Sequence, residues 1–323
     1  MQSSEGPGPA PQSATELTVF PGFGTAHLMG RVGARESTRL IHAALEFGVV
    51  HFDTARLYGL GDAEHMLGRA LRGRSDAAIY TKAGRGNPRH SRLTALAHSV
   101  VRPLARARVR AAGWAGKHLG PALAPSRQGN FSPEYLRTSV ETSLELLNRE
   151  TLDGLLLHEM TAADASQEVV GLMEALVREG KVRRFGIASE HANLVEILAT
   201  DFPYQILQQA GGPFVQPIEG GFDGKSIFHS VFGASGQDLH PFQSWLSENK
   251  GQHDALLDVA GAESLKDIPT LLISYTATKW TPAGILFSSV SENHIRANVA
   301  AVRHRLSTDS LQAVSAVLDT YKI

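Results

Sequence analysis

HFDTARLYGLGDAEHMLGRAL, residues 51–71, contains a strand, a turn and a helix in succession. Its apolar start predicts a buried strand that ends near Asp53, and Tyr58 follows in a turn bordered by glycine. The closing AEHMLGRAL has apolar residues at helical spacing. A carboxylate at the end of a buried strand is costly unless a cation or a hydrogen-bond donor pairs with it. Asp53 therefore needs a partner from elsewhere in the chain.

The same alternation of strand and helix continues along the chain. Helical patterns cover 36–48, 63–73, 132–148 and 165–180, and apolar or β-branched runs separate them. This alternation is typical of a (β/α)8 TIM barrel, an α/β fold. An open doubly wound sheet is the alternative, but no GxGxxG follows the first predicted strand. The eight predicted strands are 20–26, 49–55, 78–84, 152–158, 182–188, 204–210, 226–232 and 283–288.

Composition limits the classes of protein that fit. A chain of 323 residues with 42% hydrophobic and 20% charged residues suits a single barrel domain over 18–323. Residues 1–17 are rich in Pro, Ser and Gly and predict a flexible tail without signal-peptide features. The net charge of -1 favours neither a nucleic-acid nor a membrane partner. The lack of cysteine excludes thiolate chemistry and is compatible with the cytoplasmic location that we expect.

One segment departs from the average composition. Residues 77–133 contain ten Lys or Arg and no Asp or Glu. Most of this stretch, 85–131, predicts a basic insertion between the third strand and the next helix. In a barrel this connection lies on the C-terminal face, where active sites are found. The insertion is therefore either a solvated flap or a surface for an anionic substrate or a cofactor phosphate.

Polar residues stand at or just after three successive strand ends. Asp53 ends the second strand, Tyr58 lies in the loop after it, Lys82 ends the third strand and His158 ends the fourth. Each alone is more often a turn or packing residue, but residues at the carboxyl ends of barrel strands converge on one face. Together they indicate a catalytic site in which Lys82 can be the counter-ion of Asp53.

Several motifs resemble the aldo-keto reductase superfamily, in its bacterial sugar or aldose dehydrogenase-like branch. They are HFDTARLYG, IYTKAG, TLDGLLLH and EGKVRRFGIAS, and the likeness extends from PGFGTA at 21–26 to ENHIRANVAAV at 292–302. The resemblance implies a barrel that binds NAD(P) without a Rossmann domain. It also implies hydride transfer between a carbonyl (an aldehyde, ketone or sugar) and an alcohol. The substrate would be a small molecule, and the sequence does not identify it.

The resemblance assigns roles to the four strand-end residues. Tyr58 would be the general acid or base, Lys82 and Asp53 would tune it, and His158 would orient the carbonyl. Because free tyrosine has a pKa of about 10, an ammonium beside Tyr58 is expected to lower that pKa.

The resemblance also places the cofactor. Glu190 stands where the family usually has an asparagine, and a carboxylate accepts hydrogen bonds but cannot donate them. Ser288 and His294 stand where a lysine and an arginine often bind the 2′-phosphate, yet family membership still favours NADP(H) over NAD(H). The expected cofactor residues are Gly24, Thr25, Ala26, Asp53, Ser189, Glu190, Gln208, His229, Ser288, Ser289, Val290, His294 and Asn298.

Two other functions remain open from the residues. Glu190 and the altered adenosine segment would suit a non-catalytic barrel that binds nicotinamide as a regulatory subunit. A metal-dependent barrel hydrolase is the other, although it leaves Tyr58 and Lys82 unexplained. Its candidate ligands are His51, Asp53, His158, Glu190 and His191.

Overall fold

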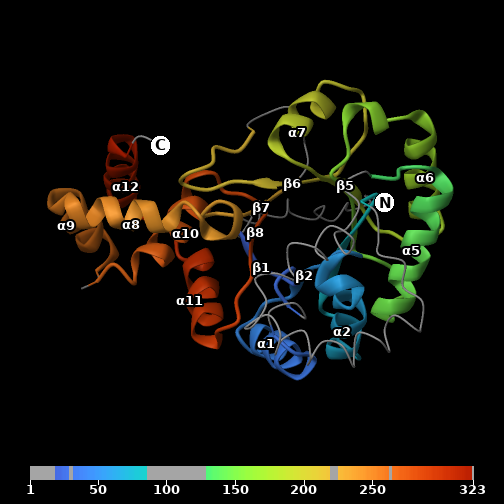
Figure 1. Ribbon diagram of the computed structural model, residues 1–323, viewed down its shortest axis with the longest axis horizontal. Coiled ribbons are helices and arrows are strands. Elements are labelled where there is room, and N and C mark those ends of the chain that lie inside the picture. Colours follow the sequence, from blue (N-terminus) through green and yellow to red (C-terminus); the bar gives the residue numbers. More distant parts are fainter. Residues whose placement is uncertain (1–18, 29–31, 86–128, 219–224, 262–263, 322–323) are drawn as a thin grey trace, which may run out of the picture.

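Eight parallel strands close into a barrel in this computed structural model, which describes residues 19–28, 32–85, 129–218, 225–261 and 264–321. Each strand pairs with its neighbours in chain order, and β1 closes the ring against β8 (Figure 1). The predicted (β/α)8 barrel is confirmed, and each predicted strand range overlaps one observed strand. The strands are β1 (Phe20–Gly24), β2 (His51–Asp53), β3 (Ala78–Ala83), β4 (Gly154–His158), β5 (Phe185–Ala188), β6 (Ile206–Ala210), β7 (Lys225–His229) and β8 (Gly284–Phe287).

Helices surround the barrel (Figure 1). The four predicted helical patterns correspond to α1 (Ala34–Glu46), α2 (Ala63–Ala70), α5 (Pro133–Leu147) and α6 (Gln167–Arg178). None of the helices in the described ranges is both long and apolar enough to cross a bilayer. The others are α7 (His191–Leu198), α8 (Leu239–Glu248), α9 (Lys250–Ala260), α10 (Ile268–Lys279), α11 (Glu292–Arg303) and α12 (Thr308–Thr320), with short 3-10 turns η1 (Tyr58–Gly61), η2 (Ala162–Asp164) and η3 (Ala234–Gly236).

The predicted tail, 1–17, and most of the predicted basic insertion lie outside the described residues. The two ends of the insertion lie inside them. Arg85 and Gly129 form an antiparallel bridge between β3 and α5. The two described ends of the insertion are therefore joined directly after β3, on the C-terminal face of the barrel.

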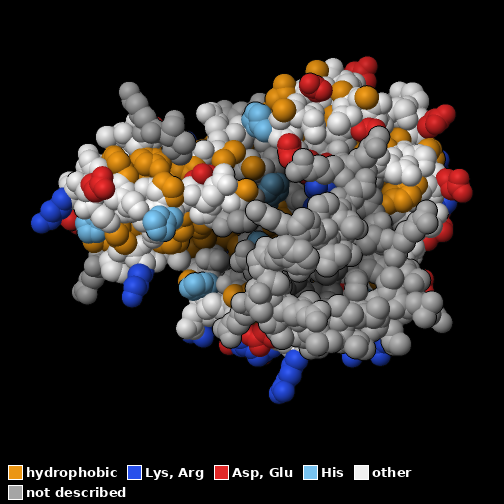
Figure 2. Space-filling model, in the orientation of Figure 1, with side chains coloured by type: hydrophobic (Ala, Val, Ile, Leu, Met, Phe, Trp, Pro, Cys, Tyr) orange, Lys and Arg blue, Asp and Glu red, His pale blue; other side chains and the backbone are white. Residues whose placement is uncertain are grey.

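A lobe of α8, α9 and α12 stands beside the barrel, on the left in Figure 1. Helix α10 packs between this lobe and the barrel, and residues on all its sides are buried, including Leu272, Ile273 and Tyr275. A helix with apolar residues all round must be covered on every face. The lobe supplies part of that cover, and Figure 2 shows further hydrophobic side chains on its visible face.

Aromatic rings and glycines alternate at the amino-terminal end of the barrel. The His51 ring lies between those of Phe20 and Tyr80, with centroids 4.5 and 4.3 Å away. Each ring occupies space left by a glycine on a neighbouring strand, such as Gly154 beside Tyr80. His51 Nε2 is buried without a hydrogen-bond partner among the described residues. His51 is thus a packing residue inside the barrel. It lies below the carboxyl ends of the strands, where the other candidate metal ligands of the hydrolase hypothesis stand.

Substituting Gly154 tests this packing. A Cβ at Gly154 would lie 2.6 Å from Cδ2 of Tyr80. Because an extra methyl in a filled interior forces its neighbours to move, Gly154→Ala is expected to cost about 1–3 kcal/mol in the free energy of unfolding, measured by denaturant titration.

Gly171→Ala is the matched control. Gly171 lies in α6, and its added Cβ would meet no atom within 4 Å. Alanine is the better helix former, so this variant should gain up to about 1 kcal/mol. Equal stability of the two variants would contradict the proposed packing.

Candidate active site

A cavity of about 810 Å3 opens at the carboxyl ends of the strands. Asp53, Tyr58, Lys82 and His158 all line it, although the first and last are far apart in sequence. Parallel barrel strands bring their carboxyl ends to one face, so residues from β2, β3 and β4 meet there. The expected cofactor residues that line the same cavity are Gly24, Ala26, Asp53, Ser189, Glu190, Gln208, His229, Ser288, Ser289, Val290 and Asn298.

Two expected cofactor residues lie elsewhere. The side chain of Thr25 is fully buried, and its Oγ1 donates to Oγ1 of Thr54 at 2.9 Å. The backbone N–H of Thr25 donates to the carbonyl of Asp53, also at 2.9 Å. Thr25 therefore braces the ends of β1 and β2. His294 is exposed on α11 and does not line the cavity.

Asp53 and Lys82 form a buried ion pair inside the barrel. The Lys82 ammonium donates to Oδ1 of Asp53 and, at 3.1 Å, to the carbonyl of Thr54. The other carboxylate oxygen of Asp53 accepts from Nε2 of Gln208 at 2.8 Å. These contacts supply the partners that a buried strand-end carboxylate requires.

The surroundings of Lys82 keep its ammonium charged. Burial by itself lowers the pKa of Lys82, but the negative charge of Asp53 and the Tyr58 hydroxyl outweigh burial and raise it. Lys82 Nζ lies 5.2 Å from the centroid of the Tyr58 ring. The cavity thus places a fixed positive charge beside a phenol.

The pKa of Tyr58 does not move in the expected direction. Burial raises this pKa, and the opposing effect of the Lys82 ammonium is smaller. The expectation of a net lowering was therefore wrong, because it considered the ammonium without the loss of solvent around the phenol. Tyr58 holds its proton at neutral pH and can act as a proton donor.

Two histidines in the cavity are neutral at neutral pH. The His158 ring is edge-on to the Tyr58 ring, with centroids 6.2 Å apart. Burial, followed by the charges of Lys82 and Arg85 and by His229, lowers the pKa of His158 well below its ordinary value. Burial also lowers the pKa of His229 to about 4. A neutral imidazole can donate one hydrogen bond and accept another.

Glu159 is a cavity residue that the sequence did not suggest. It directly follows His158 and adopts a left-handed backbone conformation, with φ 57°. Burial and the nearby Glu190 carboxylate raise its pKa. In the sequence, its position immediately after a strand-end histidine was the only signal that could have indicated it.

Among the cavity-lining residues that the structure describes, Lys82 is the only Lys or Arg, and it is paired with Asp53. These residues therefore offer no unpaired ammonium or guanidinium to an anion.

The far end of the cavity can accommodate a polar ligand. The Ser288 hydroxyl is buried and has no hydrogen-bond partner among the described residues. Ser289 Oγ accepts from the backbone N–H of Ser291 at 3.1 Å, just before α11 begins. A helix start and an unsatisfied hydroxyl suit a phosphate or ribose group. This end of the cavity therefore fits part of a dinucleotide.

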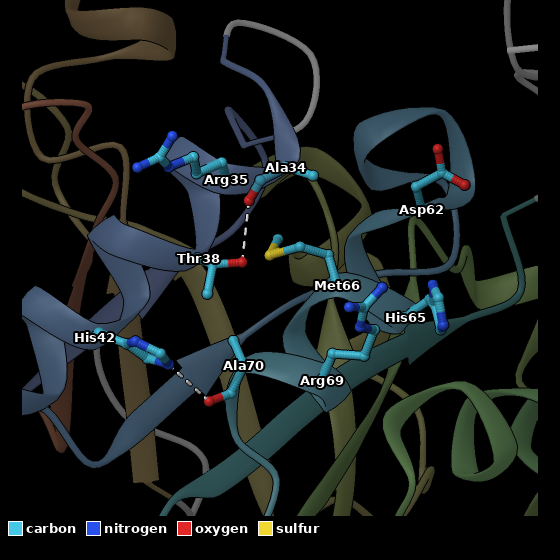
Figure 3. Close-up of a pocket in the computed structure, with 9 residues that line it drawn as sticks. All are labelled: Ala34, Arg35, Thr38, His42, Asp62, His65, Met66, Arg69 and Ala70. Carbon is cyan, nitrogen blue, oxygen red and sulfur yellow. Dashed lines mark hydrogen bonds between the residues drawn. The ribbon is translucent and has the colours of Figure 1, made fainter. Parts of the chain in front are cut away.

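A second, smaller cavity of about 410 Å3 lies on the outer wall between α1 and α2 (Figure 3). His42 and Thr38 face it from α1, and Met66 and Arg69 face it from α2. It contains none of the strand-end residues, so the cavity inside the barrel mouth is the candidate active site. In the described ranges, no three His, Asp or Glu side chains form a possible metal site, which leaves the hydrolase hypothesis unsupported.

Replacing Asp53 tests the buried ion pair. Asp53→Asn preserves shape but leaves the Lys82 ammonium buried without its counter-ion. Breaking a buried pair in this way should cost about 3–5 kcal/mol in the free energy of unfolding, measured by denaturant titration.

Asp76→Asn is the control, because Asp76 is exposed and pairs with Arg74 at 2.8 Å. Exposed pairs contribute little, so the unfolding midpoint of this variant should stay near that of the parent protein. If both variants lost the same stability, the importance given to the buried pair would be refuted.

Comparison with known proteins agrees with this geometry. A model of the Aldo/keto reductase family matches residues 22–211. A probable aldo-keto reductase of Glycine max is 24% identical over 74% of this chain and 68% of its own. An aldo-keto reductase of Schizosaccharomyces pombe, whose name specifies NADP(+), is 23% identical over 61% of this chain, which spans half of that protein. The solved holo structure of an aldo-keto reductase from Bacillus halodurans has a TM-score of 0.65 at 18% identity, covering 93% of this chain and 91% of its own.

Proposed function

The chain belongs to the aldo/keto reductase family, and on this premise we propose that it is an NAD(P)-dependent oxidoreductase that interconverts a carbonyl and an alcohol. One observation carries the proposal: a protonated Tyr58 lies beside the Lys82 ammonium and the neutral His158 in the cavity at the strand ends. These groups suit proton transfer to an oxygen that gains negative charge. A barrel that only binds nicotinamide has no need of them.

Each residue has a part in the reduction of a carbonyl. When bound, the nicotinamide cofactor supplies the hydride. Tyr58 gives its phenolic proton to the carbonyl oxygen, and an N–H of neutral His158 donates a hydrogen bond to the same oxygen. The Lys82 ammonium stabilises the phenolate that Tyr58 becomes, while Asp53, itself bound by Gln208, holds Lys82 in place. In the oxidation of an alcohol, the phenolate takes the proton back.

The cofactor would lie along the cavity. We assign its nicotinamide end to Gly24, Ala26, Asp53 and the group of Ser189, Glu190, Gln208 and His229, and its adenosine end to Ser288, Ser289, Val290 and Asn298. NADP(H) is preferred over NAD(H), in line with the S. pombe relative whose name specifies NADP(+).

The substrate class follows from the charges in the cavity. Its described rim carries Glu159 and Glu190, and Lys82 is already paired. A neutral aldehyde, ketone or sugar therefore fits this part of the cavity better than an anion. An anionic substrate would require the basic insertion 85–131, most of which lies outside the described residues. We place the reaction in the cytoplasm and propose neither a nucleic-acid nor a membrane partner.

Tyr58→Phe tests the mechanism, because it removes only the phenolic hydroxyl, which carries the proton to be transferred. Carbonyl-dependent oxidation of NADPH should fall to background, while the Kd for NADPH, measured by fluorescence quenching, should stay within about twofold. Full turnover by the variant would refute the role of Tyr58. A parent protein that bound NADPH but turned over no aldehyde, ketone or sugar would support the regulatory barrel.

His294→Arg tests the adenosine end. His294 lies outside the cavity but four residues before the cavity residue Asn298 on α11, and the resemblance would bring the 2′-phosphate to it. An arginine there could form a charge-assisted hydrogen bond with that phosphate. The Kd for NADPH should fall about tenfold, whereas the Kd for NADH should not change, because NADH lacks this phosphate. An equal change for both cofactors would contradict the proposed orientation.

A further inference from the structure

A second buried charge network lies behind the active site. Glu64 of α2 is wholly buried against the outer wall of the barrel and does not line the cavity. Its Oε1 accepts from Oγ1 of Thr81 at 2.6 Å, and its Oε2 accepts from Nη1 of Arg56 at 2.9 Å. Both partners are themselves buried. A buried ion pair seldom stabilises a fold more than apolar residues of similar volume would. This network is therefore a candidate for a role other than stability.

The two donors lie on the two segments that carry the proton-transfer residues. Thr81 directly precedes Lys82 on β3. Neighbouring residues of a strand point to opposite faces, so Lys82 points into the barrel and Thr81 points out toward α2. Arg56 lies in the connection from β2 to η1, two residues before Tyr58. One carboxylate therefore joins the segment of Tyr58 to the strand of Lys82.

We propose that Glu64 is a positioning residue, which sets the separation of Tyr58 from Lys82 by binding Arg56 and Thr81 at once. The inference rests on the proposed function of Tyr58 and Lys82 as the proton-transfer pair. Glu64 touches neither the cavity nor the reacting groups, so it acts through the two segments that it joins.

The position of Tyr58 needs such a brace. It begins a 3-10 turn of only four residues, and the hydrogen bonds of so short a turn restrain it weakly. The interaction between the phenol and the ammonium depends on their distance, 5.2 Å from Nζ to the ring centroid. A displacement of about 1 Å in a catalytic pair can cost about 100-fold in rate.

Thr81→Val and Thr81→Ser separate positioning from packing. Valine keeps the shape of threonine but cannot donate to Glu64, whereas serine keeps the hydroxyl. We expect Thr81→Val to lower kcat about tenfold with an unchanged Kd for NADPH, and Thr81→Ser to stay within about twofold of the parent. Thr142→Val, which removes a hydroxyl from the surface of α5, is the control and should behave like the parent.

A readout that needs no turnover accompanies the kinetics. With tyrosine labelled with 13C at Cζ, the Tyr58 signal is assigned by its loss in Tyr58→Phe. It is then followed from neutral pH to the alkaline limit of the folded protein. Thr81→Val should move this signal and shift its titration to higher pH, because the ammonium is no longer held beside the phenol. Thr81→Ser should restore both, and Glu64→Gln should give a larger change if it folds.

The outcomes distinguish the two proposals. An unchanged Tyr58 signal and unchanged kcat in folded Thr81→Val would overturn the positioning role. A moved Tyr58 signal in a protein that turns over no carbonyl would leave the positioning role in place and refute the proposed function. Equal losses in the valine and serine variants would reduce Thr81 to packing and likewise overturn the inference.

Discussion

The ion pair of Asp53 and Lys82 inside the barrel is the interaction on which the site depends. A buried pair of charges rarely stabilises a fold more than apolar residues of the same volume would. This pair is satisfied on both sides, since Gln208 and the Thr54 carbonyl complete its hydrogen bonds. The fold thus holds a buried, charged ammonium beside the phenol of Tyr58, where protein atoms replace most of the solvent that would screen it.

The barrel makes this arrangement possible because β2 and β3 both carry side chains toward its axis, while β3 also carries one toward α2. Toward the axis they carry the aromatic layer of His51 and Tyr80, and above it the pair of Asp53 and Lys82. Away from the axis, Thr81 meets the buried carboxylate of Glu64. The strands are therefore held by the aromatic layer, by the contact of Thr81 with Glu64 and by the ion pair itself. A preorganised polar centre requires such fixed positions.

The site combines features of its family with local departures. The strand-end residues Asp53, Lys82 and His158 and the turn residue Tyr58 stand together in one cavity. Around them, Glu159 and Glu190 form an acidic rim, and the resemblance places Ser288 and His294 at positions where basic residues are common in the family. In the proposed function these differences would affect cofactor and substrate selection, because the four residues proposed for proton transfer are unchanged.

The sequence by itself determined the barrel and the set of four polar residues. Both can be predicted from local patterns, namely the alternation of strands with helices and the polar residues at or just after strand ends. The tertiary structure alone decided the rest. It raised the pKa of Tyr58, buried Thr25 beside Thr54, left His294 outside the cavity and joined Glu64 to Arg56 and Thr81. The burial of a side chain and the electrostatic effects on its pKa depend on neighbours that are distant in the chain. A local sequence pattern does not show which residues those neighbours are.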